Sequence, residues 1–215
     1  MTHDFLPIGR RDFLLALALP AVAIGVPWHP AIAAAANDAD AIAPIQRLDA
    51  ALLVAMKAGQ GTPFEQRYAT LAPVVEQTFD LNAVLAASVG LRWSGIPNDQ
   101  KAQLFAAFRR YSVASYAASF DHFSGQTFEV LPAVRPVGNG EVIVQSKLVS
   151  GDGSVTPLNY VMRNGPAGWK AVDVLAGGSI SRVAVQRSDF RSLLESGGVP
   201  QLVIALQSKV SNLAA

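Results

Sequence analysis

Four short runs between residues 126 and 174 constrain the fold of this chain more than any other feature. Each run is rich in β-branched and aromatic residues, as strands are. The segments between them are Gly-Asn-Gly (138–140), Gly-Asp-Gly-Ser (151–154) and Asn-Gly-Pro-Ala-Gly (164–168), which are typical of tight turns. Consecutive strands joined by short turns pair antiparallel. The sequence therefore predicts a four-stranded antiparallel meander.

Alternation along these runs predicts that one face of the sheet is apolar, because successive side chains of a strand point to opposite sides. The side chains predicted on this face are Val142, Val144, Leu148, Leu158, Tyr160, Met162, Val172 and Val174. Trp169 and Asp173 fall on the opposite face of the fourth run. An apolar sheet face must be covered, and helical sequence flanks the sheet on both sides, so we predict an α+β fold.

Helical spacing of apolar residues predicts helices over 38–58, 63–78, 81–89 and 97–120, and two C-terminal helices that begin near Ser188 and Pro200. Thr62, Pro63 and Glu65 have the spacing of a capping box, and Asp80 is placed to cap the third helix. Pro73 is expected to kink or split the second helix.

The composition indicates a single, apolar globular domain. The chain has 215 residues, of which 51% are hydrophobic and 15% are charged. Its formal net charge is +1, and no run of like charges offers a nucleic-acid-binding surface, so no nucleic acid is expected as a partner. The absence of cysteine excludes disulfides and a lipoprotein anchor.

Residues 1–36 have the features of an export signal. Arg10 and Arg11 precede the apolar run 13–26, and Ala31-Ile32-Ala33 supplies small residues for a signal peptidase. The pair of arginines resembles a twin-arginine signal, and the apolar run is too short to cross a bilayer. We predict a cleaved signal peptide over 1–36, either twin-arginine or general secretory, and one soluble periplasmic domain over 37–215.

Few residues offer catalytic or metal-binding chemistry. His122 is the only histidine after the leader, so a zinc site is not expected and a Ser-His-Asp triad would have to use it. Its place at a predicted helix end favours a capping role. Asp173 is expected either on the solvent face or, as we favour, paired with an arginine such as Arg187 or Arg191. Tyr160 with Asp173 leaves open a cofactor-free isomerase, in the manner of ketosteroid isomerases.

Several segments resemble the MlaC family, which is also called the toluene-tolerance or auxiliary phospholipid-binding family. The resemblance runs in matching order over about Pro63 to Lys209, and its most specific piece is Trp169-Lys170-Ala171-Val172-Asp173-Val174. The other segments are Phe79-Asp80, Gly90-Leu91-Arg92-Trp93, Gln100 with Phe105, Phe108 and Tyr116, Gly125-Gln126, Glu129-Val130-Leu131-Pro132, Gly168 and Arg187-Ser188-Asp189-Phe190. The leader and the segment 90–93 resemble the HpnM branch, which is associated with hopanoid biosynthesis. The chain departs from the family at Gln186, usually a tyrosine, and at Ile96, usually Ser or Thr.

The resemblance implies a lipid carrier with an apolar cavity between a sheet and helices. We predict that the cavity is lined by Leu85, Trp93, Phe105, Phe108, Tyr116, Phe120, Val144, Leu148, Tyr160, Val172 and Val174. The ligand implied is a phospholipid or a hopanoid, and the partners are membrane transport complexes of an ABC transporter system that it meets transiently. No catalysis and no cofactor are expected, and the protein is expected to be a monomer. The alternatives are the isomerase and an envelope interaction module with a filled core.

Overall fold

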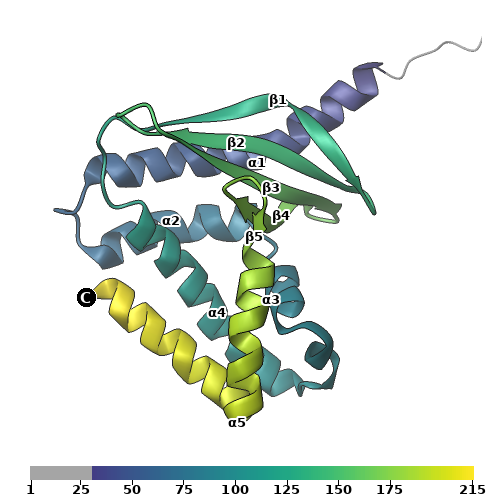
Figure 1. Ribbon diagram of the computed structural model, residues 1–215, viewed down its shortest axis with the longest axis vertical. Coiled ribbons are helices and arrows are strands. Elements are labelled where there is room, and N and C mark those ends of the chain that lie inside the picture. The colour runs from purple at the N-terminus through teal and green to yellow at the C-terminus, as the bar shows by residue number, and fades with distance from the viewer. Residues whose placement is uncertain (1–30) are drawn as a thin grey trace, which may run out of the picture.

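The structure, a computed structural model, describes residues 31–215, with side chains from residue 38 onward. Residues 1–30 of the predicted signal peptide lie outside the described part. The helices are α1 (Ala31–Ala58), α2 (Phe64–Thr78), α3 (Leu81–Val89), the 3₁₀-helix η1 (Gly90–Gly95), α4 (Asn98–Ser119) and α5 (Arg182–Ala214). Together with a single antiparallel sheet they form the mixed α+β fold that the sequence predicts (Figure 1).

The sheet is an antiparallel meander in chain order β1-β2-β3-β4-β5. The strands are β1 (Thr127–Gly138), β2 (Glu141–Val149), β3 (Val155–Gly165), β4 (Gly168–Ala176) and β5 (Ile180–Ser181). The first four confirm the predicted strands. The fifth, which the sequence does not predict, is a two-residue strand that pairs with Leu175 and Ala176 and leads directly into α5.

A β-bulge in β4 changes the predicted faces of that strand. Tyr160 pairs with Val174, but Met162 pairs with Ala171, so one extra residue is inserted between the two pairs. Ala171 therefore shares the face of Tyr160 and Met162, whereas Val172 is buried outside the main core cluster. The prediction that Val172 and Val174 share a face, with Trp169 opposite, is wrong. Simple alternation cannot place such a bulge.

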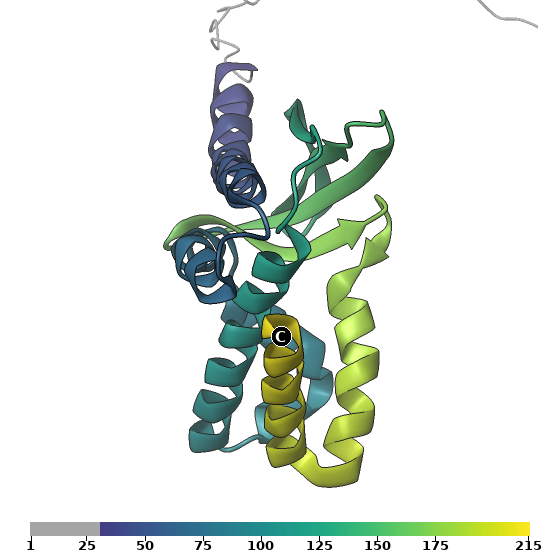
Figure 2. The same cartoon turned by 90° about the vertical axis from the view of Figure 1, so that its left-hand side faces the viewer.

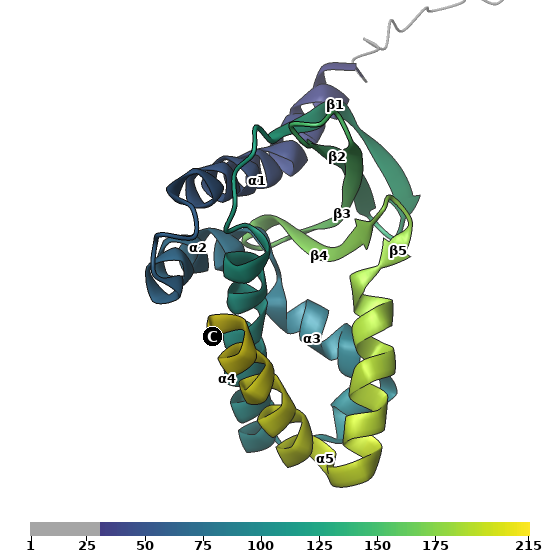
Figure 3. The ribbon, with the colours of Figure 1, turned by 60° about the vertical axis from the view of Figure 1, so that its left-hand side comes forward.

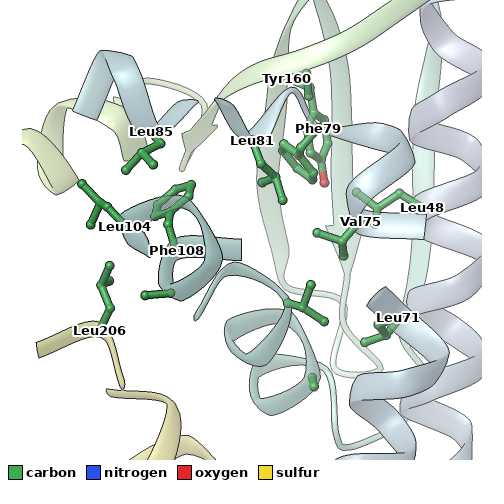
Figure 4. Packing of buried hydrophobic residues seen from close by; sticks show 14 of the residues in the cluster. Leu48, Leu71, Val75, Phe79, Leu81, Leu85, Leu104, Phe108, Tyr160 and Leu206 are labelled. Carbon is green, nitrogen blue, oxygen red and sulfur yellow. The ribbon is translucent and has the colours of Figure 1, made fainter. Parts of the chain in front are cut away.

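The concave side of the sheet is covered by α1 and α2, and α3, α4 and α5 form the lower part of the molecule (Figures 2 and 3). Leu48 and Leu52 of α1, Leu71 and Val75 of α2 and Val144 of β2 are all fully buried in the joint core. Figure 4 shows Leu48, Leu71 and Val75 from this part of the core. The same view shows Leu85, Leu104 and Phe108, which pack among the lower helices. The sheet and the helical part thus share one continuous core.

Helix α5 bends back on itself. Its backbone leaves helical geometry at Gly197 and Gly198, where Gly198 has a φ of 65°, a conformation that favours glycine. The C-terminal half then returns beside α4, where the Lys209 ammonium forms a cation–π contact with Tyr111, 5.7 Å from the centroid of the ring. The predicted break is confirmed, but the first half begins at Arg182 and not near Ser188.

Two predicted features of α2 differ from the structure. Thr62 does not cap α2: its Oγ1 donates to Ala58 O at 3.0 Å, while Pro63 occupies the cap position without a side-chain bond. Helix α2 also continues through Pro73 to Thr78 without a break. The predicted cap of α3 is confirmed, because an Asp80 side-chain oxygen accepts from the Ala83 amide at 2.9 Å.

Candidate functional site

A cavity of about 350 Å³ lies where the sheet meets the helical part of the molecule. The junction of α2 and α3, the inner face of α4, the strands β3 and β4 and the first turn of α5 all contribute to its walls. Its aliphatic lining consists of Val75, Leu81, Val84, Leu158, Val174, Ala176 and Val183. Such a mostly apolar cavity with a few polar groups is typical of a small-molecule binding site.

Aromatic rings form a continuous wall of this cavity. Phe79 lies 5.7 Å from Tyr116 and 6.3 Å from Tyr160, measured between ring centroids. Tyr116 is stacked on Phe120 with an interplanar angle of 12°. Phe79 and Tyr160 are seen side by side in Figure 4. Phe108 also lines the cavity. This wall of tilted and stacked rings offers a broad apolar surface to a ligand.

The hydroxyl groups on the cavity wall are neutral. Burial raises the pKa of Tyr116 above the usual value, although the positive charge of Arg182 partly offsets this effect. Burial likewise raises the pKa of Tyr160 well above the usual value. The hydroxyls of Ser112 and Ser115 donate to carbonyl oxygens of their own helix, at 2.9 and 2.8 Å. None of these groups is therefore activated as a base or a nucleophile.

Asp173 lines the cavity, but it is held by hydrogen bonds to the start of α5. Its Oδ1 accepts from the Val174 amide at 2.7 Å and from the Val183 amide at 3.1 Å, and its Oδ2 accepts from the Ser181 hydroxyl. No ion pair among the described residues involves Asp173, and Arg187 instead donates to Ala87 O at 2.8 Å. The predicted arginine partner is therefore wrong, because the Ser181 hydroxyl and the Val183 amide at the start of α5, together with the Val174 amide of β4, supply the donors instead.

We expect Asp173→Asn to lower the free energy of unfolding by about 1.5 to 3 kcal/mol, the usual contribution of hydrogen bonds to a charged group. Chemical denaturation measures this loss. Ser181 is the N-cap of α5, and its Oγ accepts from the Ala184 amide at 2.9 Å. Ser181→Ala should cost about 0.5 to 2 kcal/mol, and the double variant should lose less than the sum. Strict additivity would show that the two side chains do not act together.

The structure brings some of the predicted site residues to the cavity and leaves others elsewhere. Those that line it are Phe108, Tyr116, Phe120, Tyr160 and Val174. Those that do not are Leu85, Trp93, Phe105, Val144, Leu148 and Val172. Phe105 faces a smaller polar pocket of about 210 Å³ beside an Arg109–Glu76 ion pair of 3.2 Å.

Some residues that line the cavity are not predicted by the sequence, and one side chain lies elsewhere than predicted. Phe79 and Leu81 at the α2–α3 junction line the cavity, as does Gln186 on α5, which is 3.0 Å from the Ser88 hydroxyl. The only signals for them in the sequence are the family segment Phe79-Asp80 and the departure from tyrosine at position 186. His122 lies in an exposed loop after α4, away from the cavity, and makes no capping bond among the described residues.

Residues 46–208 match the family model described as MlaC protein. The chain belongs to the MlaC family. Among solved structures it is similar to a phospholipid-binding protein from Ralstonia solanacearum, determined in complex with a phospholipid. The TM-score is 0.70 and the sequence identity 22%, over 82% of this chain and 99% of that chain. At this identity the likeness shows a shared fold.

Further features of this MlaC family member concern membranes and metals. Between residues 31 and 215, no helix combines the length and the apolar character needed to cross a bilayer. In the same part of the chain, no three His, Cys, Asp or Glu side chains gather in a group that could hold a metal ion. Family membership supports a role in lipid binding or transport.

Proposed function

We propose that this MlaC family member is a periplasmic carrier that encloses a lipid tail in its cavity and moves the lipid between membranes. The observation that carries the proposal is the cavity between sheet and helices, with its aromatic wall. A carrier does no bond chemistry, and the cavity wall presents neutral hydroxyls and a fully hydrogen-bonded carboxylate. The phospholipid complex of the structurally similar protein supports the same ligand class.

The size of the cavity indicates what part of a lipid it encloses. A water molecule occupies about 30 Å³ in the liquid, and a methylene group is of similar size, so a 350 Å³ cavity holds on the order of 12 methylene groups. Burying one methylene is worth about 0.8 kcal/mol, which gives roughly 10 kcal/mol for such a tail. The cavity thus suits one acyl chain held against the aromatic wall, whereas a polycyclic skeleton of the size of a hopanoid would be enclosed only in part.

Two alternative functions receive less support from the same cavity. An isomerase would need a carboxylate free to accept a proton, and both oxygens of Asp173 already accept hydrogen bonds. A pure interaction module would need no cavity at all, and one is present. Tyr160 and Asp173 do line this cavity, so assays for carbon-acid isomerisation remain a useful control.

Native mass spectrometry of the protein purified from its host periplasm tests the proposal. We expect a monomer that carries one lipid mass, which is lost on extraction with organic solvent and regained on incubation with that lipid. Tandem fragmentation would identify the lipid as a phospholipid or a hopanoid. A protein that emerges without any lipid, and that takes up none after extraction, would contradict the carrier function.

The predicted export signal gives a separate test of localisation. Cleavage within Ala33–Ala36 should leave an exported protein whose N-terminal sequence begins in or just after this region. Replacing Arg10 and Arg11 with Lys should block export if the twin-arginine route is used. Unchanged export of this variant would indicate the general secretory route. An exported protein that still begins at Met1 would refute the predicted cleavage.

A further inference from the structure

We propose that Arg182 binds the anionic head group of the lipid at the mouth of the cavity. This inference rests on the proposed carrier function and names a chemical preference of the same site. The ligand class is a single-tailed or multi-tailed amphiphile whose head carries a carboxylate or a phosphate, and a neutral head group on the same tail should bind less tightly.

Arg182 is placed where a head group would emerge from the cavity. It is the first residue of α5, it lines the cavity, and it is also exposed to solvent. Gln186 lies one helical turn further along α5 and lines the cavity as well. If the tail lies against the aromatic wall, the head group would therefore lie at this edge of the cavity, next to solvent and to the guanidinium of Arg182.

The guanidinium of Arg182 is available for a ligand. Among the described residues, no ion pair or side-chain hydrogen bond involves it. The neighbouring carboxylate of Asp173 accepts hydrogen bonds from the Ser181 hydroxyl and from the Val174 and Val183 amides. An arginine presents five N–H donors in a planar fork, which matches the oxygens of a carboxylate or a phosphate.

No other cation competes for this role among the described residues that line the cavity. The buried phenols are neutral, and the protons of Ser112 and Ser115 are used within α4. The positive charge of Arg182 also counteracts the effect of burial on the pKa of Tyr116, so its field extends to the aromatic wall. Arg182 is therefore the group that would attract a negatively charged head group.

Binding of three probes with the same tail tests the proposal: dodecanoate, dodecyl phosphate and dodecan-1-ol. The protein is stripped of lipid, and dissociation constants are measured by competition with a fluorescent fatty acid at pH 8 and low ionic strength. Because Arg182 is exposed, we expect the two anions to bind about fivefold more tightly than the alcohol. Comparison of the two anions distinguishes a carboxylate from a phosphate head group.

Variants of Arg182 separate charge from packing. Arg182→Gln should remove the preference for the anions and leave the affinity for dodecan-1-ol unchanged. Arg182→Lys should retain most of the preference for the anions. Arg191→Gln removes an exposed charge from the same helix, outside the cavity, and should change nothing. High salt should reduce the preference in the wild type.

The possible failures are distinguishable. If dodecan-1-ol and the anions all fail to bind, the proposed carrier function itself is contradicted. If dodecan-1-ol binds and the wild type shows no preference for either anion, the cavity binds tails but Arg182 is not a head-group site. A preference that persists in Arg182→Gln would likewise overturn the assignment, because another group must then supply the charge.

Discussion

Replacing Asp49 with Asn should stabilise the protein at pH 8 and have little effect at pH 4. Asp49 lies on α1 and only 5% of it is exposed. Its Oδ2 accepts from the Ser146 hydroxyl of β2 at 3.4 Å, and its Oδ1 is buried without a hydrogen-bond partner. Burial raises the pKa of Asp49 from 3.8 to about 7, and the bond from Ser146 opposes this shift only in part.

The sign of the effect follows from where the proton is bound. Between about pH 4 and pH 7 the folded protein keeps a proton on Asp49 that the unfolded chain has released, so stability falls as pH rises through this window. Each pKa unit is worth about 1.4 kcal/mol, which gives a penalty on the order of 4 kcal/mol above pH 7. Asn cannot ionise and avoids this penalty.

Chemical denaturation at several pH values measures this prediction. The difference in unfolding free energy between Asp49→Asn and wild type should grow from near zero at pH 4 to its full value at pH 8. Asp40→Asn is the matched control, because Asp40 is an exposed aspartate on the same helix. A difference that does not vary with pH would show that Asp49 keeps an ordinary pKa.

The fold was largely predictable because its signals are local. The turns at 138–140 and 164–168 and the β-branched runs between them specify the meander, and Asp80 and Gly90 bound α3 as expected. Where tertiary contacts decide, prediction failed. The bulge at Val172 follows from how β4 pairs with β3, and no feature of the run itself indicates it.

The candidate site was predictable only in part, for a related reason. Phe108 and Tyr116 lie on one side of the long helix α4 and Phe120 directly follows its last residue, so their common direction could be inferred from spacing alone. Phe79 and the start of α5 belong to junctions between elements, and Asp173 in β4 is bound to that start of α5. The pairing of β5 with β4 determines where α5 begins, and an isolated bridge to Ala171 positions Phe79. Residue spacing within one element carries no information on either arrangement.

Val174→Trp should weaken lipid binding strongly while the protein remains folded. Val174 is half-buried on β4, opposite Tyr160, and lines the cavity, unlike Val172 one bulge away. An indole at this position occupies space that we assign to the tail. Excluding three to four methylene groups would cost about 3 kcal/mol of tail burial, which corresponds to a loss of affinity on the order of 100-fold.

Competition binding with a fluorescent fatty acid measures the loss, and circular dichroism with thermal unfolding monitors the fold. Val137→Trp makes the same change on β1, where the side chain is 40% exposed, and should bind like wild type. Overpacking alone costs about 1 to 3 kcal/mol, so the smaller Val174→Leu serves if the tryptophan variant is too unstable. It should shorten the longest tail that still binds. Wild-type affinity for every tail length in both variants would show that the tail lies elsewhere, and the cavity described above would not be the binding site.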